Sequence, residues 1–316
     1  MTKLTIAIPT YNRCRYLLET LDSIVCQLNE EVEVIISDNA SSDNTEEVVQ
    51  EYIKKYNIKY YKNEKNEGMD YNFLNCIDKA KGEYVHLMSD DDIMLKHAID
   101  RILEYIDLYQ PDYIHLNSIS FWDKIENSNL INRINLEEDL VSIDKDIYME
   151  KLGVYITYLS STIIKKENFK KIYKPEKYIG TYFLHSHILL EILKGEGKVV
   201  ITKEPYIGAR MHNSGGFNLY EVWVKQYKRL LMDTGEKAGY SHTMMKKIYL
   251  KDVKGFITDS ILKYNVERDI YDISGVGILF KNTFMYPSVW FKTYTIALMP
   301  LWLKKIVYRI KRRNYK

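Results

Sequence analysis

The first 120 residues alternate short apolar runs with segments of helical periodicity, and this alternation constrains the fold more than any other feature. Apolar runs typical of buried strands lie at residues 4–8, 33–37, 58–61, 83–88 and 112–117. Segments with apolar residues at helical spacing lie between them, at about 12–28, 43–56, 70–81 and 95–109. Alternation of this kind predicts an α/β protein with a mostly parallel central sheet and helices on both faces.

The pattern loosens after residue 120, where residues 159–164 are a candidate strand, a helix is predicted at 182–193 and a strand at 198–202. The remainder has the periodicity of helices, and neither an internal repeat nor a low-complexity linker interrupts the chain. We therefore predict a domain over 1–218, with halves at 1–120 and 121–218, and a helical C-terminal region over 219–316.

Polar side chains follow three of the predicted strands, at the point where each strand ends. The sequence PTYNR follows the first strand, Asp38 follows the second, and Ser89, Asp90, Asp91 and Asp92 follow the fourth. Ligands of parallel sheets bind outside the carboxyl ends of the strands. The three groups are therefore expected to meet in one ligand site.

The acidic triplet Asp90, Asp91 and Asp92 has two explanations. It could be a solvated loop that caps the helix near Leu95, a position where an acidic residue contributes about 0.3–1 kcal/mol. One carboxylate would be enough for that, and three neighbouring charges repel by roughly 1 kcal/mol per pair even in water. A hard divalent cation, Mn²⁺ or Mg²⁺, removes the repulsion because carboxylate oxygens are its preferred ligands. Position alone does not decide between the two.

Charge and cysteine content exclude several classes of protein. The net charge of +2 argues against nucleic acid as a partner. The three cysteines, Cys14, Cys26 and Cys76, form no CxxC pair, which is typical of a reduced, cytoplasmic protein without a disulfide framework or zinc site. No signal peptide is recognisable at the N-terminus. The apolar window near the C-terminus, 293–303, is too short to span a bilayer.

The tail, 287–316, combines basic and aromatic residues. Seven of the last thirteen residues are Lys or Arg, and Trp290, Phe291, Leu301, Trp302 and Leu303 precede or accompany them. This pattern favours a basic amphipathic segment in peripheral contact with the inner face of the plasma membrane. The alternative is a helix that packs on the rest of the protein and leaves a solvated basic end.

Three spaced blocks within residues 4–95 carry a family resemblance: TIAIPTYNR, VIISDNASSDNT and NEGMDYNFLNCIDKAKGEYVHLMSDDD. They resemble family-2 glycosyltransferases with the GT-A fold, and among these the bacterial surface-polysaccharide enzymes of the abequosyltransferase type. The resemblance implies a metal-dependent, inverting glycosyltransferase that uses Mn²⁺ or Mg²⁺. Its donor would be a nucleotide-sugar, with a UDP-sugar expected, and its acceptor a saccharide or lipid-linked saccharide.

The resemblance also implies roles by position on the donor side. Pro9, Thr10 and Tyr11 would line the nucleotide-base pocket, and Asp38 would accept a hydrogen bond from the base. Asp38 could equally form an Asx-turn in DNASSDNT. Arg13 is counted with these donor-binding candidates, although an arginine in a first helical turn is more often a surface residue.

The segment Ser89 to Asp91 stands where the family has its Asp-x-Asp motif. Asp91 would bind the metal that bridges the donor diphosphate, and it is counted with the catalytic residues. Ser89 replaces the first aspartate, so Asp90 would contact the ribose or reach the metal through water. The family often has Ala-Arg-Asn on the third helix, and Asn72 lies at that place here without the arginine.

The general base is the least defined role. The family commonly uses an aspartate of a Glu-Asp pair that opens a helix, and the corresponding region, 178–193, has no such pair. His185 is the candidate chosen, because imidazole titrates near neutrality. His187 is the alternative candidate. The two would not act together, since a spacing of two residues puts their side chains on different helix faces. Either residue could instead be a packed or surface histidine.

The segment GARMHNSGG, 208–216, resembles a family pattern in which a histidine after the last core strand reaches the metal or the diphosphate. His212 is the metal-binding candidate, and Arg210 is a candidate phosphate partner through its planar guanidinium. An ordinary glycine turn explains the segment equally well.

Two rival functions stay open. A nucleotidyltransferase shares nucleotide-binding α/β architecture, but the glycine-rich loop usual in that class is absent near the N-terminus. A catalytically inactive, membrane-associated family member that serves as a complex subunit is the other, because Ser89 and the missing Glu-Asp pair depart from the family pattern.

Overall fold

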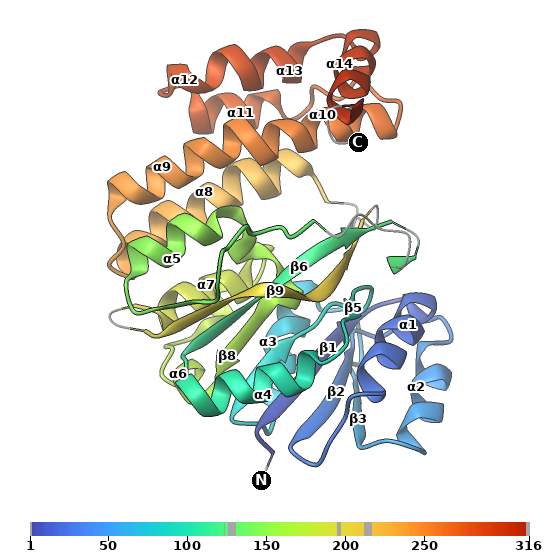
Figure 1. Ribbon diagram of the computed structural model, residues 1–316. Coiled ribbons are helices and arrows are strands. Elements are labelled where there is room, and N and C mark those ends of the chain that lie inside the picture. Colours follow the sequence, from blue (N-terminus) through green and yellow to red (C-terminus); the bar gives the residue numbers. More distant parts are fainter. Residues whose placement is uncertain (1, 123, 126–130, 195–196, 212–216, 314–316) are drawn as a thin grey trace. The chain divides into compact units, whose positions relative to one another are not determined.

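The computed structural model describes residues 2–122, 124–125, 131–194, 197–211 and 217–313 (Figure 1). The chain forms two compact units, residues 1–214 and 215–316, and each is described by itself. The first unit holds all the strands of the described residues, and the described part of the second is helical.

One nine-stranded sheet organises the first unit, in the order β3-β2-β1-β4-β8-β6-β9-β5, with β7 also paired to β9. The strands are β1 (Leu4–Thr10), β2 (Val32–Asp38), β3 (Ile58–Lys62), β4 (Tyr84–Leu87), β5 (Ile93–Met94), β6 (Tyr113–Phe121), β7 (Leu140–Ser142), β8 (Thr162–Lys165) and β9 (Val199–Arg210).

The helices of the first unit are α1 (Cys14–Val25), α2 (Thr45–Ile53), α3 (Met69–Lys79), α4 (Ala98–Tyr109), α5 (Lys145–Leu152), α6 (Lys166–Phe169) and α7 (Leu184–Ile192). Short 3₁₀ turns lie at η2 (Gly153–Thr157), η3 (Leu159–Ser161) and η4 (Pro175–Tyr178).

The helices of the second unit are α8 (Tyr227–Arg229), α9 (His242–Asp252), α10 (Thr258–Glu267), α11 (Val276–Thr283), α12 (Pro287–Val289), α13 (Thr295–Leu298) and α14 (Leu301–Arg313). Stretches of π-helix join them at η5 (Tyr220–Gln226), η6 (Leu230–Gly235), η7 (Val253–Ile257) and η8 (Trp290–Tyr294). Within the described residues, no helix is both long and apolar enough to cross a bilayer.

Alternation along the first strand explains the layers of the first unit. Leu4, Ile6 and Ile8 point to one face, where they share a core with apolar residues of α1, α2 and α4. The intervening residues belong to the other face, and α3 contacts β1, β2 and β4. The predicted sheet with helices on both faces is therefore confirmed.

The sheet is mixed, because the second half of the unit adds antiparallel strands. β1, β2, β3 and β4 pair in parallel, as do β6 and β9, whereas β8 runs antiparallel to both β4 and β6. The candidate strand at 159–164 corresponds to β8, but its antiparallel pairing was not predicted, because it follows a stretch without clear periodicity.

Several predicted boundaries were wrong by a few residues. The first strand continues through Pro9 to Thr10, both in register with β2, because the proline ring is compatible with an extended backbone. The helix predicted from residue 43 begins at Thr45, whose amide donates to Asp43 Oδ1 at 3.1 Å. The two-residue strand β5, beside the acidic triplet, was missed.

Candidate active site

The three groups of polar residues predicted to converge do lie at one edge of the sheet. Thr10 at the end of β1 is in register with Asp38 at the end of β2. Met88, which directly follows β4, lies beside β1, because its amide donates to the Ala7 carbonyl oxygen at 2.9 Å. The sequence after Met88 is Ser89-Asp90-Asp91-Asp92, so the acidic triplet follows directly from this edge.

Asp38 is fully buried at the end of β2 and both its carboxylate oxygens have partners. The Ser41 amide donates to Oδ1 at 2.8 Å, and the Tyr60 hydroxyl donates to Oδ2 at 2.5 Å. Asp38 thus forms the Asx-type turn that was one of its two predicted roles. Because the side chain is fully buried, a base N–H would have to displace one of these partners to reach it.

The end of β1 presents one exposed ring. Pro9 and Thr10 are buried, whereas the Tyr11 side chain is 44% exposed. Asn12, which follows, has a positive φ of 54° and turns the chain into α1. A flat aromatic surface at this edge can stack on a nucleotide base.

One guanidinium nitrogen joins two carboxylates of the acidic triplet. Arg13 Nη1 lies 2.8 Å from Asp91 Oδ2 and 3.3 Å from Asp90 Oδ1. Ser89 completes the arrangement by donating its hydroxyl to Asp91 Oδ1 at 2.5 Å. The arginine of the first helical turn is therefore part of this site and not a free surface residue.

Burial is the main influence on the pKa of Asp90. It raises this pKa above the usual range of aspartate, while the positive charge of Arg13 opposes the rise. A buried carboxylate beside a second one needs a cation to stay charged. In the structure Arg13 supplies that charge.

The described residues fit a divalent cation held by two carboxylates. They contain no group of three or more His, Cys, Asp or Glu side chains arranged to hold a metal. Asp90 Oδ1 and Asp91 Oδ2 nevertheless converge on a single cationic atom, Arg13 Nη1. Mg²⁺ commonly takes one or two protein carboxylates and completes its shell with water and substrate phosphates.

Asp92, the third carboxylate, has a structural role. Its Oδ2 accepts hydrogen bonds from the Tyr158 hydroxyl at 2.7 Å and the Ser160 hydroxyl at 2.5 Å, and its Oδ1 accepts from the Arg210 amide at 2.9 Å. Ser160 also accepts from the Ser89 amide at 2.9 Å. Asp92 therefore anchors the acidic loop on η3 and β9, whereas Asp90 and Asp91, which are also buried, meet Arg13.

Arg210 holds the same loop from the end of β9. Its Nε donates to the Asp91 carbonyl oxygen at 2.9 Å, and its guanidinium pairs with Glu19 and lies over the ring of Phe121 at 4.6 Å. Binding a phosphate would require the guanidinium to exchange Glu19 for the new anion. His212, the predicted metal ligand, lies outside the described residues.

Asn72 on α3 is buried and its amide is used by the sheet. Nδ2 donates to the Ser37 carbonyl oxygen at 2.8 Å, and Oδ1 accepts from the Ser37 hydroxyl at 2.6 Å. The side chain therefore fixes α3 on the end of β2. Both of its amide atoms are used in this contact, and its predicted role as a donor contact stays a prediction.

His185 and His187 on α7 are both buried. His185 Nε2 donates to the Thr157 carbonyl oxygen at 3.0 Å, while its buried Nδ1 has no hydrogen-bond partner among the described residues. Burial lowers the pKa of His185 to about 4. His187 stacks on Tyr178, with ring centroids 4.4 Å apart. The histidines point into different surroundings, as their spacing predicted.

Three residues of the site were missed from the sequence. Tyr60 lies in a predicted strand, and its place beside the strand that carries Asp38 was the signal for a contact. Ser160 and Tyr158 gave no signal, because they reach Asp92 from a segment 66 and 68 residues away.

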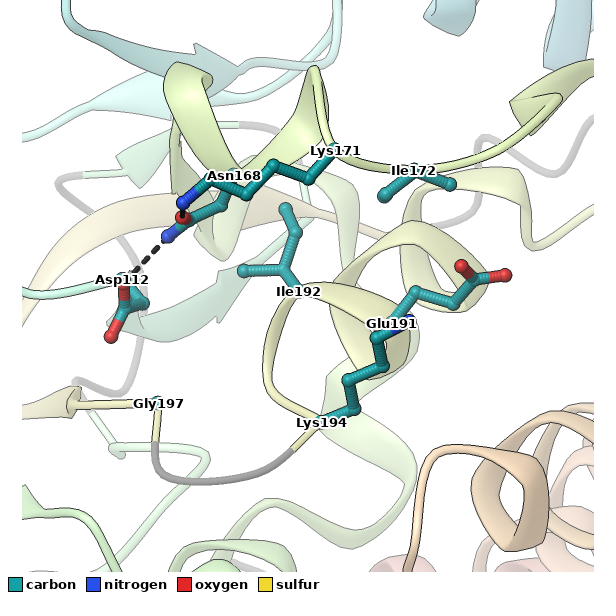
Figure 2. Close-up of a pocket in the computed structure, with 8 residues that line it drawn as sticks. All are labelled: Asp112, Asn168, Lys171, Ile172, Glu191, Ile192, Lys194 and Gly197. Atoms are coloured by element: carbon teal, nitrogen blue, oxygen red, sulfur yellow. Dashed lines mark hydrogen bonds between the residues drawn. The ribbon is translucent and has the colours of Figure 1, made fainter.

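A pocket of about 320 Å³ lies elsewhere on the first unit (Figure 2). It is lined by Asp112, Asn168, Lys171, Ile172, Glu191, Ile192, Lys194 and Gly197. Asp112 precedes β6 and bonds the Lys198 amide just before β9, so the pocket lies at the amino ends of these strands. Because β6 and β9 are parallel to β1, this is the opposite edge from the acidic site.

Sequence comparison gives relatives with known activities. The chain is 34% identical over 206 residues to abequosyltransferase RfbV of Salmonella typhimurium, a match of 61% of this chain and 62% of that protein. It is 31% identical over 175 residues to the GalNAc(5)-diNAcBac-PP-undecaprenol beta-1,3-glucosyltransferase of Campylobacter jejuni, covering 54% of this chain and 56% of the relative. The chain thus spans less than two thirds of the length of these relatives.

Structural comparison agrees on the fold. The structure of Staphylococcus aureus TarS 1-349 in complex with UDP-GlcNAc superposes with a TM-score of 0.65 over 98% of this chain and 92% of that one, at 15% identity. The predicted GT-A fold is confirmed. The model of glycosyl transferase family 2 matches residues 5–173. The chain therefore belongs to glycosyl transferase family 2.

Proposed function

We propose that this protein is a metal-dependent, inverting glycosyltransferase that transfers a sugar from a nucleotide-sugar to a saccharide acceptor in bacterial surface polysaccharide synthesis. The observation that carries the proposal is the convergence of Asp90 Oδ1 and Asp91 Oδ2 on one cationic atom at the carboxyl edge of the sheet. Two carboxylates that share a cation there suit a nucleotide diphosphate bound through Mn²⁺ or Mg²⁺.

The donor side is assigned as follows. Tyr11 stacks on the base, Asp38 accepts its N–H, and Asp91 with Asp90 holds the cation. When bound, the divalent cation supplies positive charge that offsets the charge developing on the leaving diphosphate. Arg13 is then released from the carboxylates and can turn its guanidinium toward the phosphates. A UDP-sugar is the expected donor, in line with the UDP-GlcNAc bound by TarS.

The acceptor side remains with the second half of the domain, 121–218. Inversion requires a base to take the proton of the acceptor hydroxyl as it attacks the anomeric carbon. His185 is the proposed base: its low pKa keeps it neutral, and its Nδ1 has a lone pair without a partner among the described residues. Its burial is the main point against it. Arg210 and His212 are proposed to reach the diphosphate after the donor has bound.

The acceptor is proposed to be lipid-linked, since the relative from Campylobacter jejuni carries PP-undecaprenol in its name. The enzyme would then work at the inner face of the plasma membrane in peripheral contact with it. The helical region 219–316, with its basic amphipathic tail, is the part proposed to make that contact.

Calorimetric titration of nucleoside diphosphates, with and without Mn²⁺, tests the proposal. Wild-type protein should bind UDP only with the metal, and Asp91→Asn should lose that binding because one of the two carboxylates is gone. Asp100→Asn is the matched control, since it makes the same change at an exposed position on α4. Absence of nucleotide binding under every metal condition would reject the proposal and favour an inactive subunit.

The remaining rival is a nucleotidyltransferase, which would release diphosphate from a nucleoside triphosphate. Incubating the protein with UTP and a sugar phosphate and assaying released diphosphate separates the two. A glycosyltransferase should release none above background and should instead release UDP from a UDP-sugar.

A further inference from the structure

The last 44 residues of the chain, 273–316, have a one-sided charge. They contain nine Lys or Arg and no Asp or Glu, although the whole chain has a net charge of only +2. A segment of this composition is drawn to an anionic surface.

The same segment holds a large share of the exposed apolar side chains. Ten of the 25 large hydrophobic side chains that are exposed in the described part of the chain lie in it: Ile273, Phe280, Phe284, Met285, Trp290, Phe291, Leu298, Trp302, Ile306 and Ile310. The Phe291 side chain is 88% exposed. Exposed apolar side chains gathered this densely on one segment indicate an interaction surface.

Four polar side chains of α14 are bonded to neighbouring residues. Lys304 is fully buried, and its Nζ donates to Asn265 Oδ1 at 3.0 Å and to the Ala297 carbonyl oxygen at 3.1 Å. The Tyr308 hydroxyl donates to Glu267 at 2.6 Å. Lys305 pairs with Asp269, and Lys311 pairs with Asp259.

The outward side of α14 is apolar as a consequence. Trp302, Ile306 and Ile310 follow one another at intervals of four, so they lie on one face of the helix. Their side chains are 65%, 44% and 56% exposed. A surface helix normally buries such a stripe and exposes its lysines, so the arrangement here is reversed.

Exposed cations occur in the same segment. Lys281, Lys292 and Arg309 are exposed and make no salt bridge in the described structure, and Arg309 lies on α14 itself. Exposed aromatic and branched apolar side chains in one segment with unpaired cations match the boundary between lipid headgroups and acyl chains. Charge complementarity therefore selects an anionic phospholipid surface over a neutral partner.

We propose that Trp302, Ile306 and Ile310 of α14, with Lys281, Lys292 and Arg309, bind an anionic phospholipid surface. The proposal extends the peripheral membrane contact of the proposed function and names the residues that make it. It does not depend on the transfer reaction, because lipid binding is measured without donor or acceptor.

Co-sedimentation of the full chain with vesicles tests the proposal. Wild-type protein should bind vesicles of phosphatidylglycerol and phosphatidylethanolamine and should bind phosphatidylcholine vesicles at least about tenfold more weakly. The variant with Trp302→Ser, Ile306→Ser and Ile310→Ser should bind the anionic vesicles at least about tenfold more weakly than wild type. Replacing Lys281, Lys292 and Arg309 with Gln should reduce both the binding and its dependence on salt.

A matched control carries Leu108→Ser, Ile143→Ser and Ile147→Ser, three exposed aliphatic positions of the first unit. It should bind vesicles as wild type does. Equal vesicle binding by the α14 variant and this control would overturn the proposal. A second result would also overturn it: wild-type protein forms a dimer, the α14 variant does not, and neither protein binds vesicles. That result would assign the face to a second copy of the chain.

Thermal unfolding and Mn²⁺-dependent UDP binding of the same variants separate the two proposals. An α14 variant that unfolds like wild type and binds UDP, but has lost vesicles, supports the lipid surface. If wild-type protein binds vesicles but not UDP, the result counts against the proposed donor site and leaves the lipid proposal unaffected.

Discussion

Arg13 Nη1 lies 2.8 Å from Asp91 Oδ2, so the N-cap arginine of α1 holds the carboxylate that is proposed to bind the metal. The same nitrogen reaches Asp90 Oδ1 at 3.3 Å. The guanidinium therefore lies where the two carboxylates would hold the proposed divalent cation, and the two cations would compete for one position.

Removing Arg13 should strengthen metal binding in the absence of nucleotide. We expect Arg13→Gln to bind Mn²⁺ about tenfold more tightly than wild type, because the competing charge is gone. Calorimetry or the electron paramagnetic resonance signal of free Mn²⁺ measures this. Arg15→Gln removes the same charge from an exposed position of α1 and should change the affinity little. Equal affinities for the two variants would show that Arg13 does not compete.

Ser160 should be needed for the stability of the acidic loop. Ser160→Ala removes a hydrogen bond to the buried carboxylate of Asp92 and leaves the Ser89 amide without its acceptor. We expect a loss of about 1–3 kcal/mol in the free energy of unfolding, measured in urea. Ser260→Ala, at an exposed position, should change it by less than about 0.5 kcal/mol. A Ser160 variant as stable as that control contradicts the anchoring role.

Buried His86 should make stability fall in mild acid. Its Nε2 donates to the Ser160 carbonyl oxygen at 2.7 Å, and burial lowers its pKa to about 4. An unfolded chain has histidine with a pKa near 6.5, so between pH 6.5 and 4 the unfolded state binds a proton that the native state does not. The free energy of unfolding should therefore fall with pH in this window, by at most about 1.4 kcal/mol per pH unit for this residue.

The variant His86→Gln isolates this contribution. Its stability should depend less steeply on pH than that of wild type between pH 6.5 and 4, whatever the other groups contribute. His115→Gln should behave in the same way, because burial lowers the pKa of His115 to about 3. Parallel pH curves for wild type and both variants would mean that these histidines are charged in the native protein.

His185→Gln tests the proposed base. A base should lose about 100-fold or more in turnover, with Mn²⁺-dependent UDP binding unchanged. In the pH–rate profile of the wild type, titration of His185 should not change the turnover above about pH 5, because the pKa of His185 is lowered to about 4. A less stable variant whose turnover stays within a few fold of wild type would assign His185 to packing against Phe73 and Thr157.

Gly82 should tolerate no larger side chain. A Cβ at this position would lie 2.6 Å from the Thr5 amide nitrogen and 2.8 Å from the Leu4 carbonyl carbon, both backbone atoms. Gly82→Ala should destabilise by about 1–3 kcal/mol in urea. Gly277→Ala on α11 meets nothing within 4 Å and should instead stabilise, by up to about 1 kcal/mol. The same sign for both variants would contradict the close contact.

Local patterns in the sequence were enough to predict the fold class and the edge of the sheet that carries the site. Apolar periodicity identifies each strand and helix from neighbouring residues, and parallel strands bring their carboxyl ends to one edge. Asp38, Tyr11 and the acidic triplet were placed correctly at this edge for that reason. A strand at 159–164 was also indicated, but the antiparallel direction of β8 was not, because strand direction depends on how distant segments pair.

Tertiary structure alone decided how the residues at that edge divide their roles. Three adjacent aspartates are alike in sequence, but Asp92 is anchored by Tyr158 and Ser160, while Asp90 and Asp91 meet Arg13. These partners lie 66 to 78 residues away along the chain, so no local pattern could reveal them. On α14 the amphipathic pattern was visible in the sequence. Only the packing of Lys304 against Asn265 showed that the apolar stripe faces outward, because burial depends on the neighbouring helix as well as on the residue.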